Sequence, residues 1–403
     1  MRVRIVPKKL CGKVTAVSSK SDAHRALICA ALSDAPCEVR LNAVSRDIEA
    51  TVGALISLGA RVQASSGGLL VTPLNRARRF STALDCAESG STLRFLMPIA
   101  AAICKKAIFT GSGRLPLRPQ LELTEQLRRH GCAVSADTLP LEITGKLTGG
   151  EFTLRGDVSS QYISGLLFAL PLVGGGRINL TTSLESAAYV DMTINTLARF
   201  GITVMKHENG FSVESAEEYR SPTRYETEGD WSSAAFWLVS DFLGGKVEVL
   251  GLNETSVQGD RAVKAILAEF SEAGELTIDA SGIPDLVPVL AAAACGRKEK
   301  TTFANCARLR LKESDRLKTT ADMINALGGN AQYSETELTI NGTGVLRGGE
   351  VNGANDHRIV MAAATAAAIC EETVIISNAE AVKKSYPAFF NDFVKLGGTA
   401  DVI

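Results

Sequence analysis

A glycine-centred pattern recurs along the chain at nearly constant spacing, and it limits the possible folds more than any other feature. In each copy an amphipathic helix pattern ends at a glycine and a short strand pattern follows; the glycines are Gly59, Gly131, Gly201, Gly328 and Gly397. One copy is missing between Gly201 and Gly328, where Gly274 stands as a degraded candidate in a shortened stretch. Glycine at this place predicts the left-handed conformation that ends a helix. Six copies of about 70 residues account for nearly the whole chain.

A second marker recurs with the same period. Polar residues stand immediately before apolar, often alanine-rich, helix patterns at Lys20–Arg25, Glu88–Arg94, Ser159–Tyr162, Asp230–Ala234, Pro284–Pro288 and Asn355–Arg358. Each predicts a helix N-cap followed by a buried helix. Six ordinary caps would explain the pattern. Alternatively, six equivalent helix N-termini share an orientation and attract anions to one cleft, because each N-terminus offers free N–H groups and the positive end of the helix dipole.

The repeat also predicts the fold class. A unit of about 70 residues with at least two helices and several strands is a supersecondary block, and alternating strands and helices predict layered α/β or α+β packing. Six units divide naturally into two groups of three. The boundary is expected near Glu226–Gly229, where a charged run and Pro222 indicate an exposed segment.

Composition excludes several classes of protein. Lys plus Arg is 43 and Asp plus Glu is 44, and this balance argues against a nucleic-acid-binding or membrane-surface protein. The nine cysteines form no C-x-x-C pair and predict free, buried thiols in a reducing cytosol. The four histidines show no metal-ligand spacing, so no metal site is expected. The N-terminus lacks a signal-peptide pattern, and the longest apolar run, Ile359–Cys370, is too short to span a bilayer. A cytoplasmic protein is therefore expected.

The densest charged cluster is Arg308–Arg316. If this segment is helical, Lys312 and Arg316 are i, i+4 neighbours on one face. Taken alone, the cluster is typical of a solvated, salt-bridged surface. Short basic motifs also stand at other predicted loop–helix junctions, and together they predict a site for a small, highly anionic ligand. No phosphate-binding or dinucleotide-binding glycine loop accompanies them.

Two carboxylates are the best candidates for acid–base chemistry. Asp285 follows Pro284, and Glu313 stands beside Lys312. A carboxylate among cations normally has a depressed pKa, which favours a base unless burial opposes the shift. Considered singly, each also fits a structural role.

Taken together, the motifs resemble the 5-enolpyruvylshikimate-3-phosphate synthase family over the whole chain. The resemblance is carried, in the family's order, by Lys20-Ser21-x-x-x-Arg25, Ser89-Gly90-Ser91-Thr92-x-x-Arg94, Leu117–Pro119, Ser159-Ser160-Gln161, Ser186 with Tyr189, Ile283–Asp285, Leu311–Arg316, Asn355–Arg358 and Lys383–Pro387. Each motif alone is weak, but the ordered set is highly specific.

The resemblance implies a two-domain, inside-out α/β barrel with three repeats in each domain, helices buried and sheets outward. Residues 1–19 would join residues 229–403 in one discontinuous domain, and residues 20–228 would form the other. The family's active site lies in the cleft between the domains. One repeat is expected to be shortened, because the stretch from Phe270 to Pro284 is shorter than usual and lacks a strand or two.

The reaction implied by the resemblance is transfer of the carboxyvinyl group of phosphoenolpyruvate to the 5-hydroxyl of shikimate 3-phosphate, with release of phosphate. This chemistry requires no metal or organic cofactor. The implied partners are these two small molecules, with no nucleic acid and no membrane, and the family's members are usually monomers.

The resemblance also implies a role for each matching residue. Asp285 would accept the hydroxyl proton, Glu313 would protonate the methylene carbon, and Lys20 would lie near both substrates. Shikimate 3-phosphate would be held by Lys20, Ser21, Arg25, Ser159, Ser160, Gln161, Ser186, Asp285 and Lys312. Phosphoenolpyruvate would be held by Lys20, Gly90, Arg118, Gln161, Arg316, Arg358 and Lys384.

Two alternatives remain, one within the same fold and one from a different functional class. An enolpyruvyl transferase acting on a UDP-amino sugar usually has a cysteine in a flexible Gly/Pro loop, whereas Gly111–Pro119 contains none. A non-catalytic anion-binding relative need not keep both Asp285 and Glu313. Phosphate release that requires both substrates would separate the three hypotheses.

Overall fold

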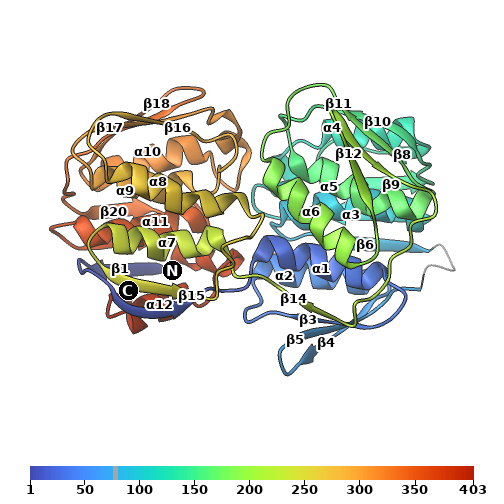
Figure 1. The fold of residues 1–403 in the computed structure, drawn as a ribbon, viewed down its shortest axis with the longest axis horizontal. Helices are drawn as coiled ribbons and strands as arrows, with labels where there is room; N and C mark the ends of the chain where they lie inside the picture. The colour runs from blue at the N-terminus through green and yellow to red at the C-terminus, as the bar shows by residue number, and fades with distance from the viewer. Residues whose placement is uncertain (76–79) are drawn as a thin grey trace. The chain divides into compact units, whose positions relative to one another are not determined.

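The 70-residue period of the sequence corresponds to one repeated arrangement of helices and strands. The computed structural model describes residues 1–75 and 80–403. Contacts between Cα atoms divide the chain into two compact units: unit 1 is Met1–Ser19 with Glu228–Ile403, and unit 2 is Lys20–Thr227. Figure 1 labels many of the helices and strands of both units. Each unit contains three copies of the arrangement, one of which is shortened in unit 1.

A complete copy runs in the order strand, helix, strand, helix, strand, strand. One copy in unit 2 consists of β6 (Ser81–Asp85), α3 (Gly90–Ile103), β7 (Lys106–Thr110), α4 (Leu121–Arg129), β8 (Cys132–Val134) and β9 (Leu141–Gly145). The β7 strand pairs in parallel with β6 and antiparallel with β9, which gives the sheet order β6-β7-β9-β8. Each copy therefore joins a βαβ crossover to a hairpin.

Three further copies repeat this order. In unit 2 the copy is β10 (Gly150–Leu154), α5 (Ser160–Ala169), β11 (Gly176–Leu180), α6 (Ala187–Arg199), β12 (Val204–His207) and β13 (Gly210–Val213). In unit 1 one copy is β16 (Leu276–Asp279), α9 (Val287–Cys295), β17 (Lys300–Ala304), α10 (Arg316–Ala326), β18 (Asn330–Tyr333) and β19 (Leu338–Asn341). The other is β20 (Gly349–Asn352), α11 (His357–Ala366), β21 (Val374–Ser377), α12 (Phe389–Lys395) and β22 (Thr399–Val402), with β1 (Arg2–Val6) as its fourth strand.

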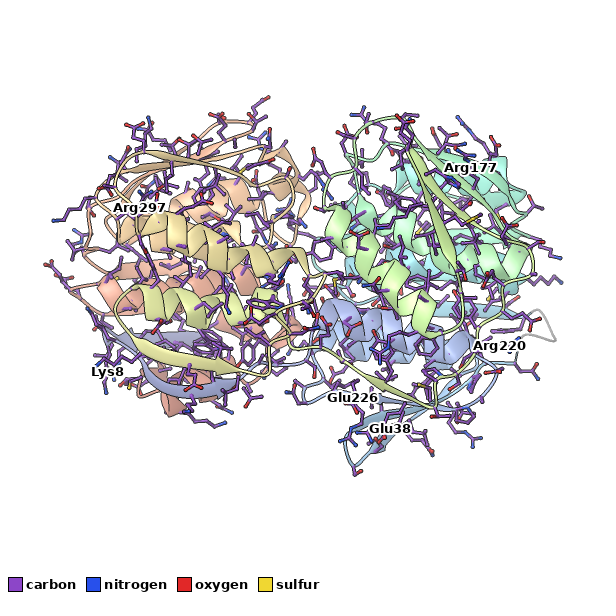
Figure 2. The ribbon with its side chains drawn as sticks, in the orientation of Figure 1. Lys8, Glu38, Arg177, Arg220, Glu226 and Arg297 are labelled. Carbon is purple, nitrogen blue, oxygen red and sulfur yellow. The ribbon has the colours of Figure 1, made fainter. Side chains whose placement is uncertain are left out.

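The two remaining copies exchange their first strands. β2 (Cys11–Thr15) precedes α1 (Lys20–Leu32) but pairs in parallel with β15 (Lys246–Leu250) of unit 1. β14 (Arg224–Glu226) precedes α7 (Trp231–Phe242) but pairs in parallel with β3 (Cys37–Arg40) of unit 2, whose copy continues through α2 (Arg46–Ser57), β4 (Arg61–Ser65) and β5 (Gly68–Thr72). Figure 2 labels Glu38 on β3 and Glu226 on β14. Each chain connection between the units therefore follows a strand that is hydrogen-bonded into a sheet.

The fourth copy is shortened, as predicted. After β15 and α8 (Val263–Phe270) the chain passes directly to β16 of the next copy, so among the described residues the sheet of this copy has only β2 and β15. Arg297, labelled in Figure 2, holds the short connection: its Nη2 donates to the carbonyl oxygens of Glu272 at 3.0 Å and Gly274 at 2.7 Å. Its guanidinium also lies 5.2 Å from the ring centroid of Phe270. Arg297 therefore supplies hydrogen-bond donors to two backbone carbonyls of the short connection between α8 and β16.

The first helix of each copy is buried, and the sheets face outward. Most residues of α1, α3, α5, α7, α9 and α11 are buried, which agrees with the apolar, often alanine-rich sequences that follow their polar starts. The strands alternate instead; in β1, Val3 and Ile5 are buried while Arg2 and Arg4 are exposed. The predicted α/β class, with six repeated units of which one is shortened, is confirmed.

The local signals that defined the repeat adopt their expected conformations. The five glycines that follow α2, α4, α6, α10 and α12 have φ between 82° and 102°, and Gly274 after α8 has φ of 114°. Side chains cap four of the buried helices, where Ser89, Ser159, Asp230 and Asp356 accept from backbone N–H groups of the first turn. α9 differs, because its N-cap residue is Leu286 and makes no side-chain cap bond. At Pro284–Pro288 the predicted buried helix is therefore present, but without a side-chain cap bond from its N-cap residue.

All nine cysteines are free thiols, and eight of them are buried. The prediction of buried thiols is wrong for Cys11, which lies on an exposed position of β2. Within residues 1–75 and 80–403, no helix is long and apolar enough to cross a membrane.

Candidate active site

The predicted site residues form two groups, one in each unit, and the groups are described separately. Unit 1 contains Asp285, Lys312, Glu313, Arg316, Arg358 and Lys384, whereas unit 2 contains Lys20, Ser21, Arg25, Gly90, Arg118, Ser159, Ser160, Gln161 and Ser186. Over the described residues, no group of three or more His, Cys, Asp and Glu side chains is placed to hold a metal ion.

Arg316 is the centre of the group in unit 1. Asp315 caps α10, so Arg316 is the first helical residue, and its side chain is only 1% exposed. The guanidinium donates to Asp285 Oδ1 at 2.7 Å, to Glu313 Oε2 at 2.5 Å and to Asp356 Oδ2 at 2.8 Å. Burial lowers the pKa of Arg316, but the three carboxylates outweigh it and raise that pKa well above its ordinary value. We call Arg316 and its three carboxylate partners, Asp285, Glu313 and Asp356, the Arg316 cluster.

Asp285 is shared among the predicted cations. Besides its bond from Arg316, it accepts from Arg358 Nη2 at 3.2 Å and forms an ion pair with Lys312 Nζ at 3.6 Å. Its side chain remains 21% exposed, whereas Arg358 is buried. A carboxylate that contacts cations and is still accessible to solvent has the properties of a general base.

The structure corrects the predicted geometry of Lys312. Lys312 follows the 3₁₀ helix η4 (Ala307–Leu311) in extended conformation, and α10 begins only at Arg316, so the two cations do not share a helix face. They meet instead at Asp285. Desolvation, assisted by the nearby charges of Arg316 and Arg308, lowers the pKa of Lys312 to about 8, although Asp285 and Glu313 oppose the shift.

Asp356 is a member of the cluster that we did not select from the sequence. It is fully buried, caps α11 by accepting from the Arg358 backbone N–H at 2.9 Å, and accepts from Ser314 Oγ at 2.9 Å. The motif Asn355–Arg358 was the available signal. Nearby, Lys384 is buried at the end of η6 (Ala379–Lys384), and its Nζ donates to the Asn355 carbonyl at 2.6 Å.

In unit 2, Gln161 is held by a residue outside the predicted site set. Gln161 Oε1 accepts from Arg94 Nη1 at 2.7 Å, and its Nε2 donates to Ser91 Oγ at 2.9 Å. Arg94 is itself fixed, because its Nε donates to Gln120 Oε1 at 2.9 Å. Gln161 lies in the first turn of α5, where Ser159 caps the helix. The start of α5 is thereby tied to the first turns of α3.

Gly90, the first residue of α3, lies against two arginines. A Cβ atom at Gly90 would lie 2.9 Å from Arg118 Nη1 and 3.1 Å from Arg94 Nη1. Contacts this short require one of the guanidinium groups to move. The absence of a side chain at Gly90 therefore permits the close approach of both cations to the N-terminus of α3.

In α1, the two predicted cations, Lys20 and Arg25, both form hydrogen bonds. Lys20 Nζ donates to Asp47 Oδ2 at 2.7 Å, and the Lys20 side chain is 15% exposed. Arg25 is buried, and it donates to Thr193 Oγ1 and to the carbonyls of Ser21 and Tyr189 at 2.5–2.8 Å. Desolvation lowers the pKa of Arg25 to about 10, with smaller opposing effects led by Asp22.

The remaining predicted residues of unit 2 lie at helix starts. Ser159 and Ser160 are the N-cap and first residue of α5, and Ser186 is the N-cap of α6, with φ of 54°. Arg118 ends the 3₁₀ helix η1 (Leu115–Leu117) and, as described, lies beside Gly90. Polar side chains and backbone N–H groups at helix starts are suited to binding anions.

Comparison with known proteins agrees on one family. The profile described as "EPSP synthase (3-phosphoshikimate 1-carboxyvinyltransferase)" matches residues 6–280 and 275–393. The chain is 41% identical to a 3-phosphoshikimate 1-carboxyvinyltransferase of Clostridium kluyveri, over 99% of this chain and 98% of the relative. It is also 41% identical to the protein of that name from Clostridium acetobutylicum, over 98% and 97%. A solved EPSP synthase from Acinetobacter baumannii is 24% identical, covers 99% of both chains and superposes with a TM-score of 0.81, which shows a shared fold.

Proposed function

Since this chain belongs to the EPSP synthase family, we propose that it transfers the carboxyvinyl group of phosphoenolpyruvate to the 5-hydroxyl of shikimate 3-phosphate and releases phosphate. The observation that carries the proposal is the Arg316 cluster. One guanidinium binds both candidate acid–base groups, Asp285 at 2.7 Å and Glu313 at 2.5 Å. The proposed reaction needs a proton acceptor and a proton donor, and it acts on anionic substrates. A cation that contacts both groups fits these requirements.

In the proposed addition step, Asp285 accepts the proton of the 5-hydroxyl while Glu313 donates a proton to the methylene carbon of phosphoenolpyruvate. The hydroxyl oxygen forms a bond to the central carbon, giving a tetrahedral intermediate that still carries the phosphate. In the elimination step the bond from that carbon to the phosphate oxygen breaks. Glu313 removes a proton from the new methyl group, the double bond is restored, and inorganic phosphate leaves with the proton that Asp285 returns.

The cations have a separate task in this proposal. Arg118, Arg316, Arg358 and Lys384, with Lys20, Gly90 and Gln161, are assigned to phosphoenolpyruvate. Lys20, Ser21, Arg25, Ser159, Ser160, Gln161, Ser186, Asp285 and Lys312 are assigned to shikimate 3-phosphate. Fixed cations stabilise the charge that develops on the departing phosphate without reorganisation during the reaction. Because residues of both units are assigned, the proposal requires the two units to act on the same pair of substrates.

The direct test is phosphate release from the purified protein without added metal or organic cofactor, with each substrate omitted in turn. We expect release only when shikimate 3-phosphate and phosphoenolpyruvate are both present. Release that instead requires a UDP-amino sugar as acceptor, or no release by a folded protein with either acceptor, would contradict the proposal. We also propose that the protein acts as a monomer in the cytoplasm, and light scattering of the purified protein tests the oligomeric state.

The depressed pKa of Lys312 gives the reaction a pH dependence. Above pH of about 8 the ammonium loses its charge, so kcat/KM for shikimate 3-phosphate should fall, approaching about tenfold for each further pH unit. The Lys312→Arg variant keeps its charge over this range, and its profile should lack this loss. Steady-state kinetics from pH 6.5 to 10 measure both. Identical alkaline limbs in the two proteins would exclude Lys312 as the titrating group.

A methyl group at position 90 is expected to weaken the binding of phosphoenolpyruvate. In Gly90→Ala the new Cβ displaces Arg118 or Arg94, so KM for phosphoenolpyruvate should rise about tenfold while KM for shikimate 3-phosphate changes little. Gly53→Ala is the matched control, since Gly53 lies within α2 and an added Cβ meets nothing within 4 Å. Initial rates with each substrate varied give both constants. Equal KM values for phosphoenolpyruvate in Gly90→Ala and Gly53→Ala would refute this assignment of Gly90.

A further inference from the structure

A carboxyl group that the proposed reaction does not use is buried in unit 1. Asp260 lies in the 3₁₀ helix η3 (Gly259–Ala262) and is 3% exposed. Its Oδ2 accepts a short hydrogen bond from Ser232 Oγ of α7. Its Oδ1 is buried and has no hydrogen-bond partner within the part of the chain that the structure describes. Burying a carboxyl group with one oxygen unsatisfied is costly, so a purely structural turn would be better served by a neutral residue.

Ser232 connects this carboxyl group to Arg358. The Ser232 carbonyl accepts from Arg358 Nη1 at 2.9 Å, while Arg358 Nη2 reaches Asp285 at 3.2 Å. The guanidinium is therefore held from two sides, by a backbone carbonyl of α7 and by the carboxylate that precedes α9. Asp260 fixes Ser232 by its side chain, and Ser232 fixes Arg358 by its main chain.

The charges support the same connection. Burial raises the pKa of Asp260 to about 7, with further raising by Asp285 and opposition from Arg358. In turn Asp285, Asp230 and Asp260 together outweigh burial and raise the pKa of Arg358. The charged groups with the largest influence on Asp260 are Asp285 before α9, Arg358 on α11 and Asp230 before α7. Asp260 is thus a negative charge that favours the charged form of Arg358, and the two residues are linked through Ser232.

We propose that Asp260 is a positioning residue for Arg358: by binding the Ser232 hydroxyl it holds the Ser232 carbonyl against the guanidinium and so orients Arg358 toward the anionic substrate. This inference rests on the proposed function, because it takes Arg358 to bind phosphoenolpyruvate. Asp260 itself touches neither substrate in this scheme. Its loss should therefore weaken phosphoenolpyruvate binding more than it slows the chemical step.

The sign of the effect separates positioning from simple electrostatics. Removing a buried negative charge beside an anion site would strengthen anion binding if repulsion were its only influence. If Asp260 orients Arg358 through a charge-assisted hydrogen bond from Ser232 Oγ, a neutral amide accepts that bond more weakly. Removing the charge then weakens anion binding instead. A variant that keeps the shape of the side chain and lacks its charge distinguishes the two.

The test compares Asp260→Asn with the wild-type protein and with Asp322→Asn, a control at an exposed aspartate of α10. At pH 8.5 we expect KM for phosphoenolpyruvate to rise about tenfold in Asp260→Asn, with KM for shikimate 3-phosphate and kcat within about threefold of wild type. Ser232→Ala, which keeps the carbonyl and loses the hydroxyl through which Asp260 acts, should raise the same constant at least as much. An unchanged or lower KM for phosphoenolpyruvate in Asp260→Asn would overturn the inference.

The pH dependence of KM distinguishes positioning from a purely structural role, which would give the same KM ratio between variant and wild type at every pH. Because wild-type Asp260 gains a proton below pH of about 7, the ratio of KM between variant and wild type should shrink to about twofold at pH 5.5. The phosphate group of the substrate also titrates near this range, but it does so equally for both proteins, so the ratio cancels it. A ratio that stays constant with pH would indicate a folding defect and overturn the inference.

Binding without turnover keeps this test separate from that of the reaction. Both tryptophans of the chain, Trp231 and Trp237, lie on α7, and Trp231 precedes Ser232. Tryptophan fluorescence can therefore follow phosphoenolpyruvate binding in the presence of shikimate 3-phosphate. If wild type binds phosphoenolpyruvate but releases no phosphate, the proposed reaction fails, and the dissociation constants of wild type and Asp260→Asn still decide the inference. If wild type does not bind phosphoenolpyruvate at all, both fail.

Discussion

Replacing Asp285 by asparagine is expected to lower kcat by about 10³-fold without raising KM for phosphoenolpyruvate. An amide cannot accept the hydroxyl proton, and a missing general base typically costs about 10²–10⁴ in rate. The same change removes the carboxylate that Lys312, Arg316 and Arg358 share. The three cations then attract an anionic substrate at least as strongly as before. The loss should therefore fall mainly on kcat, and any rise in KM should be confined to shikimate 3-phosphate, to which Asp285 is also assigned. Phosphate release with each substrate varied in turn measures these constants.

Asp322→Asn is the matched control, because it neutralises an exposed aspartate of the same unit that pairs only with Lys318 at 2.5 Å among the described ion pairs. Its kinetic constants should equal those of wild type. Two outcomes would contradict the assigned role of Asp285. A kcat within about tenfold of wild type would exclude Asp285 as the proton acceptor, and a large rise in KM with unchanged kcat would make it a binding residue instead.

The repeat could be predicted from the sequence because its signals are local. A glycine that ends a helix and a polar residue that begins one depend on a few neighbouring backbone groups, so each can be recognised from adjacent residues. Gly59, Gly131 and their equivalents adopt positive φ, and Ser89 and Asp356 cap their helices as the pattern predicts. The shortened copy followed from the break in the repeat spacing around Gly274, which is also visible in the sequence alone.

Pairings between distant segments could not be predicted in this way. The exchange of β2 and β14 between sheets depends on contacts across some 200 residues of chain, as between Tyr225 and Val39, and no periodicity encodes it. The helical interpretation of Lys312 and Arg316 failed for a related reason. The i, i+4 spacing was correct, but a 3₁₀ turn and the cap at Asp315 intervene, and Asp285 brings the two cations together from another element.

Two buried carboxyl groups, Asp356 and Asp260, were the part of unit 1 least visible in the sequence, although Asp285 and Glu313 could be selected as acid–base candidates. The basic motifs stand out because cations cluster in adjacent positions, whereas Asp356 and Asp260 are single residues about 100 positions apart. Their importance depends on contacts with distant residues, Arg316 for Asp356 and Ser232 for Asp260. In unit 2, Arg94 and Asp47 were likewise outside the predicted set, although they hold Gln161 and Lys20.

Removing the guanidinium of Arg316 should cause the largest loss of stability. In Arg316→Met, Asp356 loses its bonds at 2.8 and 3.3 Å while remaining completely buried, and Glu313 and Asp285 also lose a donor. Breaking a buried ion pair by removing one partner typically costs about 3–5 kcal/mol because it leaves an uncompensated charge. We expect a loss of that size in the free energy of unfolding of unit 1, measured by denaturant titration near pH 7 and followed by the fluorescence of Trp231 and Trp237.

The pH dependence and a second substitution distinguish uncompensated charge from a packing defect. Burial without a countercharge favours the neutral form of a carboxyl group, so the stability deficit of Arg316→Met should shrink as the pH is lowered. Adding Asp356→Asn should restore more than half of the lost stability, since an amide oxygen can still cap α11 by accepting from the Arg358 backbone N–H. A deficit that is independent of pH and unrelieved by Asp356→Asn would mean that Arg316 stabilises the unit by packing. In that case the unpaired carboxylates would not lower the free energy of unfolding. The ion pairs of the cluster would then serve substrate binding and not stability.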